Sequence, residues 1–143
     1  MSVVHIEQIR DDLTWRIRHE AMYPNLPMEA VKLDNDAEGM HFGLFADDQL
    51  VSVVSLFHVE NDYQFRKFAT ISSAQGQGFG SVLLSHIIDH VRDMGGSKIW
   101  CNARVSAVDF YAKFGFLKTN LTSQKHGIDF VIMELQLDNS LGA

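Results

Sequence analysis

The sequence has 143 residues and a mass of 16.2 kDa, enough for one compact domain with a single core and too short for a second. Its 18 acidic and 12 basic side chains give a net charge of -6, and the scattered basic residues argue against a nucleic-acid-binding surface. Cys101 is the only cysteine, which excludes an intrachain disulfide and the paired cysteine spacing of a zinc site. The sequence has no long apolar stretch, which predicts a cytoplasmic protein that does not bind membranes.

The first part of the chain predicts a strand and a helix. Residues 3–9 alternate loosely between polar and apolar and predict the strand. Asp11 and Asp12 can cap a following helix, whose apolar face carries Leu13, Ile17 and Ala21. Prolines at positions 24 and 27 end this helix, and the polar, irregular residues 28–40 predict a loop or a short second helix.

A three-stranded antiparallel meander follows. Residues 41–45 and 49–58 are rich in Val and Phe and are separated by Asp47-Asp48, which predicts a β-hairpin. A second turn at Asn61-Asp62 leads into a third strand over residues 63–71.

The last part of the chain alternates helices and strands. A helix beginning near Ser81 carries an apolar stripe at helical spacing and stops at Gly95-Gly96; the stripe consists of Leu83, Leu84, Ile87, Ile88, Val91 and Met94. Residues 98–103 predict a buried strand, and Ser106 with Asp109 predicts a capping box that opens a helix ending at Gly115. A final strand pair over residues 116–121 and 128–137 completes a mixed α+β domain.

The segment Gln75 to Gly80 joins the third meander strand to the long helix. The first-turn amides of a helix have no intrahelical partner, and the helix dipole favours an anion there. The glycines at 76, 78 and 80 remove Cβ atoms that would keep a pyrophosphate away from the backbone. A turn that only tightens packing is the alternative. A P-loop is excluded because no Gly-Lys pair precedes a Ser or Thr, and a dinucleotide fingerprint is excluded because Ser81 stands where its third glycine would be.

Gln75, Gly78 and Gly80 resemble the Q/R-x-x-G-x-G/A signature of the GNAT superfamily of N-acetyltransferases, and the resemblance covers Tyr63 to Phe116 closely. It implies a single GNAT-like domain over residues 1–143, with a mixed, mostly antiparallel sheet, a splayed central strand pair and flanking helices. It also implies an enzyme that moves an acetyl group from acetyl-CoA directly to a primary amine of a small molecule or peptide, with no metal. The acceptor itself carries no motif.

The resemblance further assigns roles to particular residues. It implies that the cofactor pyrophosphate is bound by the backbone of the glycine turn, made of Gln75, Gly76, Gln77, Gly78, Phe79, Gly80 and Ser81. The main chain from Phe68 through Ala69 to Thr70 is expected to pair with the pantetheine, and an N–H near Phe68 to donate to the thioester oxygen. The side chain of Asn102 is expected to contact the coenzyme, with a turn cap as the alternative. Tyr111 is expected to protonate the departing thiolate, with a packed core tyrosine as the alternative.

The general base is not identified by the sequence. Gln64 stands where many family members carry a carboxylate, so a noncatalytic acyl-CoA-binding or regulatory module stays open, as does an interaction domain without a ligand. His41, His58 and Glu60 are candidate bases acting through water, and each is also typical of a packed or solvated residue.

Three further features have a plainer interpretation beside the functional one. His86 and His90 have the spacing of a zinc pair, but a position opposite the apolar stripe favours a solvated face. Cys101 lies in an apolar strand and is expected to pack. The less apolar side of the first helix is either an acceptor-pocket wall or an ordinary surface; it carries Trp15, Arg18, His19, Met22 and Tyr23. The exposed sheet edge allows a homodimer by sheet continuation.

Overall fold

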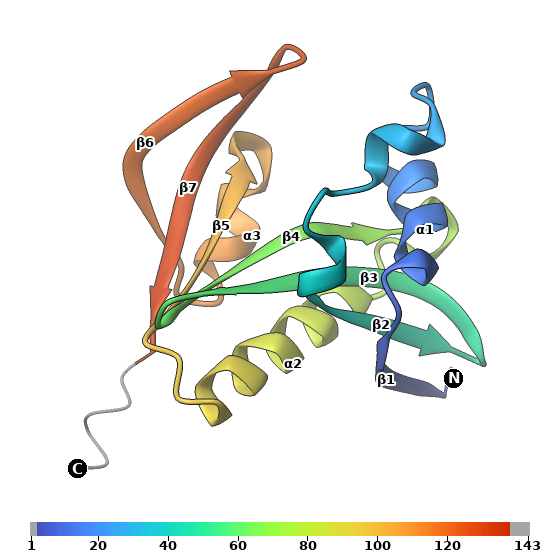
Figure 1. Cartoon of the computed structure of the whole chain (residues 1–143), viewed down its shortest axis with the longest axis horizontal. Coiled ribbons are helices and arrows are strands. Elements are labelled where there is room, and N and C mark those ends of the chain that lie inside the picture. Colours follow the sequence, from blue (N-terminus) through green and yellow to red (C-terminus); the bar gives the residue numbers. More distant parts are fainter. Residues whose placement is uncertain (1–2, 138–143) are drawn as a thin grey trace. The chain divides into compact units, whose positions relative to one another are not determined.

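The computed structural model describes residues 3–137, and within them seven strands form one mixed sheet in the order β1-β2-β3-β4-β5-β7-β6 (Figure 1). Strand pairing is mostly antiparallel, and the pair β4 with β5 is parallel. The described chain divides into two compact units, one of residues up to 57 with 66–87, the other of residues 58–65 with 88 onward. No helix in residues 3–137 is long and apolar enough to cross a membrane.

The first unit is built on three antiparallel strands: β1 (Val4–Ile9), β2 (Met40–Ala46) and β3 (Gln49–Val59). The β2–β3 turn places Asp47 and Asp48 at φ 50° and 69°, as a tight hairpin requires. The helix α1 (Asp12–Met22) lies on one face of these strands and the start of α2 (Phe79–Asp93) on the other (Figure 1). Both faces of β3 are therefore buried, which explains its nearly unbroken apolar run.

The helix α1 is capped as expected but buries a different face. The Asp11 side chain accepts a hydrogen bond from the amide of Asp12, which confirms the predicted N-cap. Ile17 is fully buried against Val53 and Ala69, whereas Leu13 is 42% exposed, so the prediction for Leu13 was wrong.

The helix α2 ends in a Schellman motif. The amide of Gly96 donates to the carbonyl of Val91, the amide of Gly95 donates to that of Arg92, and Gly95 has φ 79°. The predicted stripe is buried from Leu83 to Val91, but Met94 lies beyond the helix and is 51% exposed. The end of the helix at Gly95-Gly96 was thus predicted correctly. The predicted apolar stripe included one residue too many, because Met94 already belongs to the C-terminal cap.

The second unit contains the end of the sheet. The strand β4 (Asp62–Thr70) pairs with β5 (Lys98–Arg104) from Asp62 to Gln64, and β5 pairs along its length with β7 (Ile128–Gln136). The strand β6 (Leu117–Lys125) forms a hairpin with β7, closed by His126 and Gly127 at positive φ (Figure 1). The short helix α3 (Val108–Ala112) follows β5.

Several sequence predictions about the connections were wrong or incomplete. The expected capping box does not form: Ser106 lies in a 3-10 turn (Val105–Ala107), and the N-cap of α3 is Ala107 without a side-chain bond. Residues 28–40 contain two 3-10 turns, Met28–Val31 and Asp36–Glu38, instead of one loop or helix. The strand β6 runs to Lys125 although most of its residues are exposed, so its apolar pattern gave too little signal to predict its length.

Candidate functional site

The glycine turn follows a 3-10 turn (Ser72–Ala74) at the end of β4 and leads directly into α2. Gly76 and Gly78 have φ 79° and 83°, in the left-handed region that glycine adopts without strain. A Cβ built on either residue meets nothing within 4 Å, so this side of the turn faces open space. The carbonyl of Gly78 accepts the first helical bond from Val82, which leaves the amides of Phe79, Gly80 and Ser81 without an intrahelical partner.

Gly80 has different surroundings from the other two glycines. A Cβ at Gly80 would lie 3.4 Å from the ring of Phe68 and 3.9 Å from the hydroxyl of Thr70, which are ordinary van der Waals separations. The first turn of α2 thus lies against β4 at Gly80, whereas Gly76 and Gly78 border open space. The Gln75 side chain ties the turn to the strand by donating to the carbonyl of Thr70 at 3.0 Å.

The strand β4 contains one irregular residue, Lys67. The buried residues of the strand are Tyr63, Phe65 and Ala69, and Ala69 packs against Ile17 and Val53. Lys67 has φ 55°, which is unusual for a residue with a side chain. This left-handed residue interrupts the extended backbone and reorients the peptide that follows it. Phe68 and Thr70 lie beside Gly80.

The main-chain groups around the expected pantetheine segment are partly engaged. The Ser52 hydroxyl donates to the carbonyl of Ala69 at 3.1 Å and contacts the hydroxyl of Thr70 at 2.8 Å. The carbonyl of Thr70 already accepts from Gln75, so a ligand pairing there would use its second lone pair.

Tyr111 lies in α3 of the second unit within an aromatic cluster. Its ring is 5.7 Å from that of Phe65, 5.3 Å from that of Phe110 and 5.9 Å from that of Phe116. Burial and the nearby Cys101 raise the pKa of the Tyr111 hydroxyl, outweighing the opposing charge of Arg104. Tyr111 is protonated at neutral pH like any tyrosine, and its raised pKa makes it a weaker acid than an exposed one.

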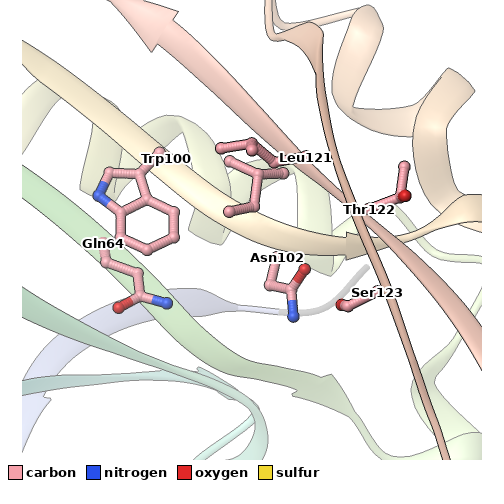
Figure 2. A pocket seen from close by; sticks show the side chains of 7 residues that line it. Gln64, Trp100, Asn102, Leu121, Thr122 and Ser123 are labelled. Atoms are coloured by element: carbon pink, nitrogen blue, oxygen red, sulfur yellow. The ribbon is translucent and has the colours of Figure 1, made fainter.

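A cavity of about 240 Å³ opens on the other face of the same strands (Figure 2). It is lined by Gln64 of β4, Trp100 and Asn102 of β5, Ile132 of β7, and Leu121, Thr122 and Ser123 of β6. Asn102, which was expected at the coenzyme, is exposed and lies in this cavity. Gln64 had been singled out as the position where many family members carry a carboxylate. The other lining residues were missed, because the sequence predicted β6 to end at Leu121 and gave no sign that β6 and β5 line one cavity.

A buried polar cluster, made of Arg18, Asp36, His41 and Ser55, was also missed. The Arg18 guanidinium makes two 2.8 Å bonds to the Asp36 carboxylate, and it also donates to the Ser55 hydroxyl and to the carbonyl of Val31. Burial would raise the pKa of Asp36, but bonds from Arg18, the Leu33 amide and Trp15 outweigh it and lower that pKa. Arg18 therefore belongs to the interior and not to the surface of α1.

The three candidate bases have different surroundings. His41 is buried, and both its ring nitrogens are engaged, with the Ser55 hydroxyl at 2.7 Å and the Asp36 carbonyl at 2.7 Å. His58 is exposed and stacks on Tyr63 at 4.2 Å, and Glu60 is exposed in the turn that follows. His41 is thus a structural residue, and the contacts of His58 and Glu60 in the described part of the chain do not orient either one toward a substrate.

The remaining polar candidates are structural in character. His86 is exposed and its ring contacts Phe42 at 5.6 Å. No group of three His, Cys, Asp or Glu side chains suited to a metal ion occurs in residues 3–137. Cys101 is buried, and burial raises the pKa of its thiol to about 12, so it is a poor nucleophile.

The chain is similar to known acetyltransferases. A family model described as an acetyltransferase (GNAT) domain matches residues 9–137. The chain is 32% identical over 123 residues to YitI of Bacillus subtilis (strain 168), an uncharacterized N-acetyltransferase, and the match covers 80% of this chain and 83% of that protein.

Two solved structures are similar at low sequence identity. A putative N-acetyltransferase from Lactobacillus plantarum superposes with a TM-score of 0.83 at 18% identity, covering 94% of this chain and 99% of that one. An acetyltransferase of Bacillus subtilis in complex with CoA superposes with a TM-score of 0.72 at 19% identity, covering 96% and 99%. At these identities the structures show a shared fold.

Proposed function

The chain belongs to the GNAT family of acetyltransferases and is an N-acetyltransferase, and from this premise we propose that it transfers the acetyl group of acetyl-CoA directly to a primary amine. The acceptor is a small molecule or a peptide, and transfer occurs within a ternary complex. Residues 1–143 act as one acetyltransferase domain, a proposal supported by the family match, which runs through both units.

The observation that carries the proposal is the open glycine turn. Gly76 and Gly78 present bare backbone at positive φ to empty space, directly before the amides of Phe79, Gly80 and Ser81, which lack intrahelical partners. Aligned amides at a helix start bind phosphate oxygens without a lysine. These residues fit a diphosphate, and in the solved CoA complex a protein of the same fold holds a ligand with that group.

The residues of β4 and α3 supply the remaining functions. When bound, acetyl-CoA supplies an activated thioester. Lys67, at φ 55°, interrupts the regular extended backbone just before Phe68, and the amide near Phe68 is the donor to the oxyanion that develops on the carbonyl. Tyr111, whose buried hydroxyl is a weaker acid than an exposed tyrosine, donates its proton to the leaving sulfur only as the carbon–sulfur bond breaks and charge develops there.

The amine enters in its uncharged form. Gln64 cannot act as a base, both ring nitrogens of His41 are engaged in hydrogen bonds, and the cavity beside Gln64 has no ionisable residue among the described residues that line it. Without a protein base, kcat/KM follows the fraction of free amine and rises about tenfold per pH unit below the pKa of the amine.

Initial-rate kinetics test this function. Thiol release is measured while acetyl-CoA and a primary amine such as benzylamine are varied. Direct transfer gives double-reciprocal lines that intersect, whereas an acetylated enzyme gives parallel lines. Parallel lines, or an acetylated protein found by mass spectrometry as a competent intermediate, would overturn direct transfer. Acetyl-CoA binding in calorimetry without turnover of any amine would favour the noncatalytic binding module.

A further inference from the structure

The cavity of the second unit is neutral throughout its described lining. Gln64 and Asn102 offer amides, Thr122 and Ser123 offer hydroxyls, and the other three lining side chains are apolar, with the Trp100 ring as the largest. Figure 2 shows the Trp100 ring and the Gln64 amide side by side at one end of the cavity, with Thr122 and Ser123 on β6 at the other end. A volume of about 240 Å³ is below the ~300 Å³ at which pockets for drug-sized ligands begin, so it suits a small group.

The cavity lies where the parallel pairing of β4 and β5 ends. Gln64 and Trp100 form the last registered pair, although β4 continues to Thr70 and β5 to Arg104. Strands that stop pairing leave backbone groups accessible to a substrate. Register also places Trp100 and Asn102 on the sheet face opposite Cys101, the neighbour of Tyr111, so the cavity and the expected proton donor use different faces of β5.

The charges at the Trp100 end of the cavity are arranged around one lysine. Lys98 is two residues before Trp100, and its ammonium lies 3.6 Å from the Asp62 carboxylate and 3.2 Å from that of Glu134. The bond to Glu134 raises the pKa of Lys98, so the ammonium stays charged. Two carboxylates against one ammonium leave one negative charge at this end of the cavity, which repels a carboxylate and tolerates an amine. Arg104, two residues after Asn102 at the other end of β5, carries a positive charge that acts on Tyr111.

We propose that this cavity binds the uncharged, flat part of the acceptor, so that the enzyme acetylates small aromatic primary amines without a carboxylate. The inference rests on the proposed function and narrows its acceptor. Trp100 packs on the ring of the acceptor, and the amides and hydroxyls bond to a neutral polar substituent. The described residues that line the cavity include no cation. Moving a carboxylate from water into the cavity would therefore leave its charge unpaired, which costs free energy.

A matched set of amines tests the charge selection. Benzylamine, para-(aminomethyl)benzamide and para-(aminomethyl)benzoate share one skeleton and differ in the charge of one substituent. We expect similar kcat/KM for the first two and a value at least about tenfold lower for the benzoate. Thr122→Arg, at an exposed position of β6, should raise the benzoate-to-benzamide ratio of kcat/KM about tenfold by supplying the missing cation.

A variant of Trp100 tests whether the acceptor binds in this cavity. Trp100→Ala should raise the KM of benzylamine about tenfold and leave the KM of acetyl-CoA unchanged. Leu117→Ala removes an exposed apolar side chain of β6 outside the cavity and should change neither. Equal rates for benzoate and benzamide in both the parent and Thr122→Arg, or an unchanged benzylamine KM in a folded Trp100→Ala, would overturn this inference and leave acetyl transfer standing. No turnover with any amine would instead count against the proposed function.

Discussion

Two polar regions of the first unit put similar chemistry to opposite uses. The glycine turn leaves open space beside Gly76 and Gly78 and leaves helix amides without intrahelical partners. The cluster around Arg18 and Asp36 is closed: its four side chains are buried and bond to one another and to nearby carbonyls. Polar groups that are bonded internally stabilise the fold, whereas polar groups that face open space are free to bind a ligand. The residue types alone do not distinguish the two cases.

The largest effect should come from opening the closed cluster. Asp36→Asn leaves the Arg18 guanidinium, whose side chain is 0% exposed, without its counter-charge, and should lower the free energy of unfolding by about 3–5 kcal/mol. Urea titration measures this. Asp89→Asn, which removes an exposed partner of Arg92, is the control and should cost about 0.5 kcal/mol or less. A loss below about 1 kcal/mol for Asp36→Asn would mean that the cluster is not a closed structural unit.

Tyr111 is packed in the interior like the closed cluster, but it is also proposed to act on the ligand, as the open turn is. Its ring lies among aromatic rings, and its hydroxyl is proposed to protonate the leaving thiolate. Tyr111→Phe should keep the packing and lower kcat about 100-fold at saturating substrates, with little change in the affinity for acetyl-CoA. Tyr63→Phe is the matched control, because it removes another hydroxyl of the second unit, one that contacts the sulfur of Met94 at 3.9 Å. Equal kcat values for both variants would assign Tyr111 to the core alone.

Gly76 and Gly95 allow a controlled test of the open turn. Both have φ 79°, and a Cβ added to either would meet no atom within 4 Å, but only Gly76 lies in the turn. Alanine at either position should cost about 1–2 kcal/mol of stability, because the left-handed backbone disfavours a Cβ. Calorimetry should show acetyl-CoA binding weakened about tenfold in Gly76→Ala and unchanged in Gly95→Ala. Equal weakening in both would attribute the loss to strain, not to a blocked ligand site.

His41 should behave as part of the closed cluster. His41→Gln should lower stability by about 1–2 kcal/mol, because one of two buried hydrogen bonds is lost. The dependence of kcat/KM on pH should keep its shape. A lost inflection in that profile would show that His41 does serve as a base.

Lowering the pH should gradually remove the stability that the ionised Asp36 carboxylate gives to the same cluster. The pKa of Asp36 is lower in the folded chain than in the unfolded one, so its ionised form stabilises the fold above about pH 4. That contribution is lost as pH falls through the folded pKa. Urea titrations from pH 6 to pH 3 should therefore show a steeper loss of stability in the parent than in Asp36→Asn, and equal slopes would contradict the assignment.

The sequence was sufficient where structure is determined locally. The turn at Asp47-Asp48, the cap at Gly95-Gly96 and the glycine turn each depend on a few adjacent residues with particular φ requirements, and all three were predicted at the right place. The GNAT fold was expected from the resemblance of Gln75, Gly78 and Gly80 to the family signature, and the family match and the solved structures confirm it.

What the sequence could not supply depends on distant partners. Arg18 looks like a surface residue until Asp36, eighteen positions later, is seen to bond with it. The cavity needs β6, β7, β5 and β4 together, and β6 has too few buried residues to indicate its own length. Ser106 and Asp109 have the spacing of a capping box, but Ser106 lies within a 3-10 turn and not at the N-cap of the helix.

The alternation of side chains beyond Lys67 makes the length of β4 as important as its composition. Substituting Lys67 changes one side chain, but inserting a residue after it would exchange the sides of every residue from Phe68 to Thr70. Phe68 and Thr70 would turn away from Gly80, and Ala69 would leave its place against Ile17. Insertions and deletions within these few residues are thus far less tolerable than point changes, and a designer grafting a new acceptor specificity onto this strand must keep its residue count fixed.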